Sequence, residues 1–174
     1  PRRSVTHPDP MTPAARIAAS IDLLAQIDTQ PNRPADAVAN DFFRARRFIG
    51  SGDRRGVSDR VWSVMRTRRR IAWWLRQDTP PARMAVAASL LLEGWALSGV
   101  DQAFSGGRYA PSPLDHAERE TLARIEGHTG AHPAMPDAVR LEIPDWLLPH
   151  LQARFGAELD HEMAAMGTNA PLDL

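Results

Sequence analysis

Apolar residues recur along most of this chain at spacings of three and four, which is the period of an amphipathic α-helix. The pair Thr12-Pro13 provides a capping hydroxyl and a proline suited to a first helical turn, so a helix is predicted over about 13–28. Pro31 and Pro34 then end that helix and admit a second one. The inward stripe of the second helix is predicted to contain Val38, Phe42, Ala45 and Ile49.

The turn Gly50-Ser51-Gly52-Asp53 leads into a third predicted helix, with Ser51 or Asp53 as its cap. Its apolar face is predicted to consist of Val57, Val61, Val64 and Met65. A helical wheel with this face inward directs four charged side chains away from the core, namely Arg55, Asp59, Arg66 and Arg70. Arg68 falls near the apolar side, where we expect it to reach for solvent or pair with an acid.

Thr79-Pro80 repeats the cap and proline pattern and predicts the most hydrophobic helix, about 80–96, at the centre of a bundle. Its inward residues are predicted to be Met84, Ala87, Ala88, Leu91 and Trp95. A short helix is expected over 99–104 and a longer one over about 112–126. The longer helix is predicted to turn inward Leu114, Ala117, Leu122 and Ile125.

The chain is predicted to be all-α, because no run of residues alternates between apolar and polar positions as a strand would. With 174 residues, of which 43% are hydrophobic, it is long enough for one ordinary core. We expect a flexible N-terminal extension at 1–11, a compact helical bundle at 12–126, and a polar loop with a helical linker at 127–174. Prolines and glycine divide that linker into three short helical pieces.

The segment 41–76 carries eleven arginines and three acids, a net charge of +8 that the rest of the chain cancels. The chain has no lysine, which matches the codon usage of a GC-rich genome, so the clustering of arginine is a stronger signal than its identity. Guanidinium groups suit phosphate recognition, and a clustered basic stripe is typical of nucleic-acid binding. Two alternatives stay open: a merely solvated face, and docking of the acidic region 82–174 of the same chain, whose net charge is −7.

Other candidate motifs are weaker. The run GSGDRRG at 50–56 has neither the spacing nor the preceding strand of a dinucleotide site, although a helix start flanked by Arg47, Arg54 and Arg55 suits one backbone phosphate. Trp73-Trp74 could stack on bases, but we favour core packing for one ring and partial exposure for the other. His161-Glu162 lacks the second histidine of a zinc-protease motif, and His128 and His132 are interpreted as surface residues, so no metal is assigned.

The chain contains no cysteine, and this excludes disulfides, thiolate metal ligands and cysteine nucleophiles within these residues. Its longest apolar run, at 84–92, reaches about half of the roughly 20 residues that cross a bilayer. The N-terminus also lacks the apolar core of a secretory signal. We therefore expect no membrane association and a cytoplasmic location.

Two stretches resemble a known family. The run ADAVANDFFRARRFIGSGDRRGVSDRVWSVMRTRRRIAWWL at 35–75 resembles the NusB-like domain of bacterial rRNA cytosine-C5 methyltransferases of the Fmu/Sun (RsmB-like) family. The run IPDWLLPHLQARFGAELDHEMAAMGTNAPLDL at 143–174 is similar to the linker helices and the Asn-Ala-Pro turn that precede the catalytic module of that family. The resemblance implies a NusB-like RNA-binding bundle followed by a helical linker.

The same resemblance implies that catalysis lies elsewhere. The family uses cysteine thiolates and S-adenosylmethionine, and this chain has neither cysteine nor a glycine-rich strand–helix motif. We therefore expect a fragment without catalytic, cofactor-binding or metal-binding residues, whose partners are ribosomal RNA and its own C-terminal catalytic domain. S-adenosylmethionine is expected as cofactor of the full-length protein.

The predicted function is to grip the backbone of 16S rRNA for the catalytic module that would follow Leu174. The candidate RNA contacts are Arg44, Arg46, Arg47, Arg54, Arg55, Arg66, Arg69 and Arg70. Two other interpretations stay open. One is a stand-alone NusB-type transcription antitermination factor that binds RNA, and the other is a protein-interaction module.

Overall fold

In the computed structural model, which describes residues 10–167, all regular secondary structure is helical and the predicted all-α class is confirmed. The elements are α1 (Pro13–Asp28), α2 (Ala35–Ala45), α3 (Ser51–Arg66), α4 (Arg68–Leu75), α5 (Ala82–Leu92), α6 (Leu97–Ala103), α7 (His116–Ala123), α8 (Asp137–Arg140), α9 (Leu148–Phe155), the 3-10 turn η1 (Gly156–Glu158) and α10 (Leu159–Met166). Most of the predicted N-terminal extension and the Asn169-Ala170-Pro171 turn lie outside the described residues.

Helix α1 forms where the sequence predicts it. The Thr12 hydroxyl accepts a hydrogen bond from the backbone N–H of Ala15 at 3.1 Å, and Pro13 occupies the first turn, where its missing N–H costs nothing. Ile17, Ile21, Leu24 and Ile27 repeat at helical spacing in the sequence; Ile17, Leu24 and Ile27 are buried and Ile21 is half-buried. This helix packs against α2, α3, α5 and α6, so it forms one wall of the bundle.

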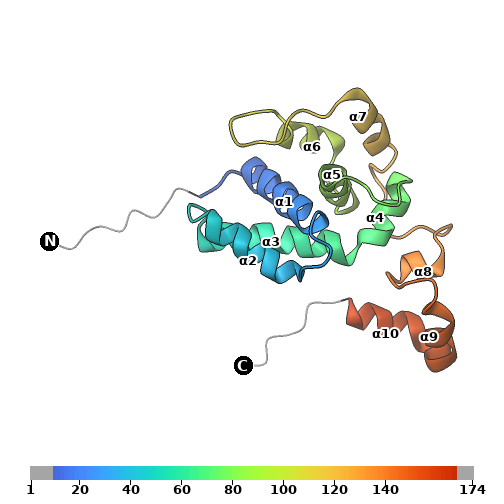
Figure 1. The fold of residues 1–174 in the computed structure, drawn as a ribbon. Coiled ribbons are helices and arrows are strands. Elements are labelled where there is room, and N and C mark those ends of the chain that lie inside the picture. Colours follow the sequence, from blue (N-terminus) through green and yellow to red (C-terminus); the bar gives the residue numbers. More distant parts are fainter. Residues whose placement is uncertain (1–9, 168–174) are drawn as a thin grey trace.

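Helix α5 is the centre of the bundle, as predicted. It packs against α1, α3, α4, α6 and α7, and Figure 1 shows it enclosed by these elements. Every residue from Met84 to Leu91 is buried. Each fully buried leucine or valine stabilises the fold by about 1.5–3 kcal/mol relative to an exposed one, so this helix supplies a large share of the hydrophobic stabilisation.

The predicted boundaries of α5 are wrong at both ends. Thr79 does not cap it, because two consecutive prolines follow and Pro81 holds Pro80 out of the helical conformation. The helix therefore begins only at Ala82. At the other end, Gly94 adopts a left-handed conformation with φ of +97° and terminates the helix. Trp95 consequently lies beyond the helix and is 38% exposed, although it was predicted to point inward.

The third predicted helix is divided in two. Its N-cap is Gly50 rather than Ser51 or Asp53, and the Asp53 carboxylate instead accepts a hydrogen bond from the N–H of Met11 at 3.0 Å. Helix α3 ends at Arg66, and the Thr67 hydroxyl donates to the carbonyl of Ser63 at 2.9 Å before α4 begins. Such back-bonding by a β-branched hydroxyl residue competes with regular helix geometry. The wheel of α3 therefore cannot be continued to Arg70.

The predicted inward residues of the second helix and of the helix at 112–126 also need correction. Ala45 is exposed at the end of α2, whereas Ile49 is buried from the loop that follows. Helix α7 begins at His116 rather than near Ser112, because Asp115 and Glu118 form a reciprocal capping box. Leu122 and Ile125 are buried as predicted, but Ala117 is exposed.

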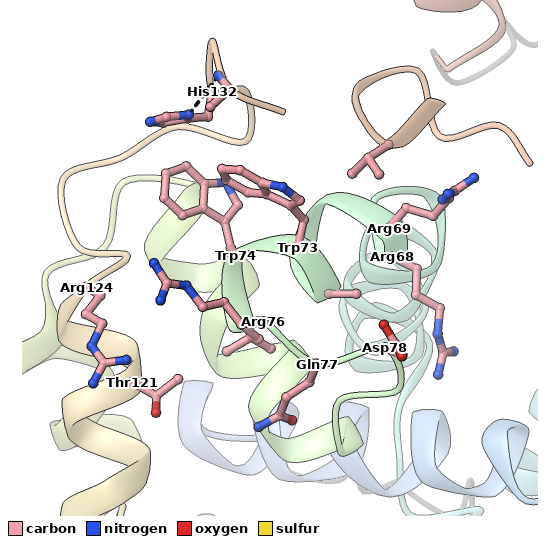
Figure 2. Close-up of a pocket in the computed structure, with 14 residues that line it drawn as sticks. Arg68, Arg69, Trp73, Trp74, Arg76, Gln77, Asp78, Thr121, Arg124 and His132 are labelled. Carbon is pink, nitrogen blue, oxygen red and sulfur yellow. Dashed lines mark hydrogen bonds between the residues drawn. The ribbon is translucent and has the colours of Figure 1, made fainter. Parts of the chain in front are cut away.

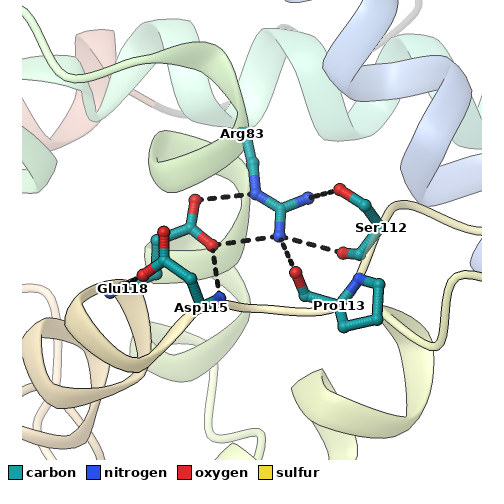
Figure 3. A network of polar contacts seen from close by, with 5 residues as sticks. All are labelled: Arg83, Ser112, Pro113, Asp115 and Glu118. Atoms are coloured by element: carbon teal, nitrogen blue, oxygen red, sulfur yellow. Dashed lines mark hydrogen bonds and ion pairs between the residues drawn. The ribbon is translucent and has the colours of Figure 1, made fainter.

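Arg83 on α5 holds the long connection before α7 against the bundle (Figure 3). Its Nη1 donates to the Ser112 hydroxyl at 3.0 Å, and its Nη2 donates to the carbonyls of Ser112 and Pro113. The Nε and Nη2 groups also form hydrogen bonds with the Glu118 carboxylate at 2.8 and 3.0 Å. One guanidinium thus satisfies polar groups from both the connection and the first turn of α7.

The C-terminal helices contact the bundle through α8, which packs on α4 (Figure 1). The main core extends from Ile17 to Ile125, and Met135, Ala138, Ile143 and Leu159 are buried outside it. Arg140 binds Asp137 and Asp160, which links α8 to α10, and the hydrogen bond from Arg140 lowers the pKa of Asp160. The division of the chain into a bundle at 12–126 and a linker region at 127–174 stays a prediction. Within residues 10–167, no helix has the length and apolar character that crossing a membrane requires.

Candidate nucleic-acid interface

Four of the eight predicted arginines line one groove between α2 and α3. This basic groove has a volume of about 730 Å³. Its arginines are Arg44, Arg47, Arg54 and Arg55, which come from α2, the following loop and the first turn of α3. Asn40, Ser58 and the half-buried Trp62 complete its polar and aromatic lining, and Asp36 is the acid among its lining residues.

The arginines of the basic groove differ in how firmly they are held. Arg54 donates from Nε to the carbonyl of Ile49 at 2.9 Å, and its guanidinium lies 5.9 Å from the ring centre of Phe43. Arg44 pairs with Asp41 at 2.9 Å. A hydrogen bond from Arg33 lowers the pKa of the Asp41 carboxyl, so this acid stays ionised at neutral pH and offsets part of the charge of Arg44.

Arg47 and Arg55 are the arginines of the basic groove for which the described residues provide neither an ion pair nor a side-chain hydrogen bond, whereas Arg54 lacks an ion pair but is held by a backbone carbonyl. Both Arg47 and Arg55 are exposed, and no acid of the described residues lies within ion-pair distance of either one. Two unpaired guanidinium groups facing one groove repel each other. An anionic ligand relieves that repulsion, and phosphate is the anion whose geometry guanidinium groups match best.

The other four predicted arginines lie elsewhere. Arg46 stacks on Phe42 with its guanidinium 3.8 Å from the ring centre, and it lines a different cavity. Arg66 is exposed at the end of α3, with no acid of the described part of the chain beside it. Neither residue adds to the basic groove.

Arg69 and Arg70 are bound by the C-terminal segment of the same chain. The Glu142 carboxylate accepts hydrogen bonds from the backbone N–H groups of both arginines at 2.9 Å, and it also accepts from Nε of Arg70 at 3.0 Å. Arg69 additionally binds the carbonyl of Ile143 and the carboxylate of Asp145. Docking of an acidic segment therefore occurs at this end of the arginine block. Arg70, predicted to point away from the core, lies outside it, but its side chain is 28% exposed and held by Glu142.

Arg60 and Arg68 are likewise neutralised within the bundle. Arg60 binds Glu93 at 2.6 Å, and Arg68 binds Asp28 at 2.7 Å, which is the acid pairing expected for Arg68. Within the arginine block, the positive charge that no acid of the described residues neutralises is therefore found around the basic groove, at the exposed end of α3 and at Arg76 after α4.

A second cleft, here called the aromatic cleft, lies beside α4 and has a volume of about 850 Å³. Figure 2 shows its lining, in which Trp73 and Trp74 lie beneath His132, and Arg76 and Arg124 lie on the same side of the tryptophan pair. Trp74 packs against the main core and Trp73 does not belong to it, although both are half-buried. This agrees in part with the expectation of one packed and one partly exposed ring.

The two loop histidines pack on these tryptophans. The ring centres of Trp73 and His132 lie 5.3 Å apart, and those of Trp74 and His128 lie 4.8 Å apart. The sequence interpretation of both histidines as isolated surface residues missed this contact, because it joins segments far apart in the chain and no local pattern indicates it. Across the described ranges, no group of three or more possible metal ligands gathers at one place.

The fold and the two clefts define an all-α protein with a basic groove and a separate aromatic cleft. Comparisons with protein-family models, curated proteins and solved structures gave no match for this chain. The family resemblance noted from the residues at 35–75 and 143–174 therefore stays a prediction.

Proposed function

We propose that the basic groove binds the phosphate backbone of RNA. The observation that carries this proposal is the convergence of four arginines from two helices and their loop on one groove, with Arg47 and Arg55 unpaired. Contacts to phosphate provide affinity and orientation without reading sequence. The polar side chains of Asn40 and Ser58 in the same groove add hydrogen-bonding groups for the sugar–phosphate backbone.

We further propose that this chain is the RNA-binding part of a SAM-dependent 16S rRNA cytosine-C5 methyltransferase. The residues at 35–75 and 143–174 that resemble the Fmu/Sun family support this assignment. In such a protein the bundle holds rRNA while a catalytic module, placed after these residues by the resemblance, carries out methyl transfer in the cytoplasm. The described residues do not fit S-adenosylmethionine, because they provide no glycine-rich strand–helix turn, and the chain has no cysteine to serve as the nucleophile.

In this proposal, the contact made by Glu142 positions the C-terminal segment relative to the bundle. It fixes the start of the C-terminal segment to α4, next to the aromatic cleft. A module attached to that segment would be held in a defined position relative to the bundle. RNA bound in the basic groove would then meet the module in one orientation.

Charge reversal in the basic groove tests RNA binding directly. The Arg47→Glu, Arg55→Glu double variant should bind 16S rRNA segments more weakly by on the order of tenfold or more, because two phosphate contacts become repulsive. The matched control is Arg108→Glu, Arg154→Glu, which changes the net charge equally at exposed positions outside the groove. Equal affinities of the two double variants, measured by fluorescence anisotropy, would contradict the proposal.

A further inference from the structure

We propose that the aromatic cleft binds an unpaired nucleotide of single-stranded RNA, with its base stacked on Trp73 and its phosphate held by Arg76 and Arg124. This inference rests on the proposed RNA-binding function but uses different residues. The lining of the aromatic cleft comes from α4, the turn after it, α7 and its C-cap Arg124, the loop at 132–134 and α8, and it shares no residue with the basic groove.

The aromatic surface of the cleft is already organised. Trp73 and Trp74 meet edge to face with ring centres 5.1 Å apart; Trp73 contacts His132, and Trp74 contacts both His128 and His132. Nδ1 of His132 accepts a hydrogen bond from the N–H of Ala134 at 3.1 Å, which fixes the imidazole against Trp73. Because these side chains are already ordered, stacking of a base on them costs little conformational entropy.

Core packing does not account for Trp73. Its indole is half-buried in the wall of the cleft, and it is not among the residues that pack against the main core. Its contacts with Trp74 and His132 leave part of the indole exposed at the wall of the cleft. Stacking with a ligand ring would cover that surface.

The charges of the cleft favour an anionic ligand. Arg76 and Arg124 are exposed, and neither has an acidic partner within ion-pair distance among residues 10–167. Figure 2 shows both side chains on the same side of Trp74, with Asp78 closer to Arg68. Arg76 adopts a left-handed backbone conformation with φ of +54° at the end of α4. That conformation costs about 1–2 kcal/mol for a residue with a side chain.

The two arginines also indicate which class of ligand the aromatic cleft could bind. Two unpaired guanidinium groups would repel a methylated lysine, and an uncharged proline-rich peptide would leave them unneutralised. A nucleotide combines a flat ring for the indole with a phosphate for the arginines. The volume of about 850 Å³ lies within the range of about 300–1,000 Å³ typical of small-molecule sites. Duplex bases are stacked on each other and cannot reach Trp73, which restricts the ligand to unpaired RNA.

The test compares a single-stranded RNA oligonucleotide with a hairpin duplex of the same composition. Trp73→Leu and the Arg76→Glu, Arg124→Glu variant should each weaken binding of the single strand by roughly 5- to 150-fold, with little effect on the duplex. Trp73→Phe keeps a stacking surface and should retain most of the affinity. Arg108→Glu, Arg154→Glu serves as the charge control.

A second readout does not depend on the stability of the variants. A single strand that carries 4-thiouridine should form photo-cross-links to the wild-type chain at Trp73, Trp74 or His132. Cross-links only at the basic groove, or single-strand binding that Trp73→Leu and the arginine variant leave unchanged, would overturn the inference while the proposed function stands. Absence of binding to both RNA probes would overturn the proposed function together with this inference.

Discussion

Glu142 joins the C-terminal segment to the start of α4 through one side chain. Its side chain is only 16% exposed and accepts three hydrogen bonds from Arg69 and Arg70. Two of these donors are backbone N–H groups in the first turn of α4, where the helix leaves such groups without internal partners. Glu142 itself has a left-handed backbone, with φ of +57°. The carboxylate therefore acts as a helix cap supplied from a distant segment.

Replacing this carboxylate should loosen the C-terminal segment. Glu142→Ala leaves the N–H groups and the guanidinium of Arg70 without their partner, which should cost about 1–3 kcal/mol. The loss should appear as faster amide hydrogen exchange at 137–143 and in the first turn of α4. Glu158→Ala, an exposed glutamate on η1, is the matched control and should leave exchange at these amides unchanged. Equal protection in the two variants would show that Glu142 does not anchor the segment.

At the scale of elements, the connection between α6 and α7 depends on Arg83. Ser112, Pro113 and Glu118 all form hydrogen bonds with this one side chain. The connection has little regular structure of its own, and Gly106 within it is left-handed and lies against the Pro113 ring. Arg83 therefore replaces backbone hydrogen bonds that a helix would have formed.

Arg83→Met keeps the aliphatic stem and removes the donors. Two carbonyls and a hydroxyl then lose this donor, and the partly buried carboxylate of Glu118 keeps the N–H of Asp115 but loses its ion pair, so the free energy of unfolding should fall by about 2–4 kcal/mol. Urea unfolding followed by circular dichroism measures the change. Arg55→Met, at an exposed position without an ion pair, should stay within about 0.5 kcal/mol of the wild type. A similar effect of both substitutions would exclude a special role for Arg83.

The elements also show which features a sequence can predict. The limits of α1 follow from Thr12-Pro13 because capping is a local interaction, and the central position of α5 follows from its continuous hydrophobicity. The division at Thr67 depends on a hydroxyl that bonds to the helix backbone, and the late start of α5 depends on two consecutive prolines. The spacing of apolar residues indicates neither feature. The packing of His132 on Trp73 depends on tertiary structure, so it could not be predicted from local pattern.

At the scale of the whole molecule, the arginine block at 41–76 divides into paired and unpaired parts. Contacts from α1, α5 and the C-terminal segment neutralise Arg60, Arg68, Arg69 and Arg70. The arginines around the basic groove keep most of their charge. The clustering in the sequence thus indicated a charged surface correctly, but the long-range ion pairs decided where that surface lies.

This distribution separates two roles within one block of sequence. The α4 end of the block holds the C-terminal segment in place, while the α2–α3 end is open to a partner. In the proposed methyltransferase, the first role positions the catalytic module and the second holds the rRNA. Substitutions at the two ends should therefore be separable, because the groups involved share no partner.

The salt dependence of RNA affinity tests the central claim most directly. Phosphate contacts by the four arginines of the basic groove release counterions, so these contacts should contribute about −3 to the slope of log affinity against log salt for single-stranded RNA. Reversing Arg47 and Arg55 should remove about half of that contribution and so make the measured slope shallower. Affinity that does not respond to salt, or a slope that the reversal leaves unchanged, would contradict binding of the RNA backbone in the basic groove.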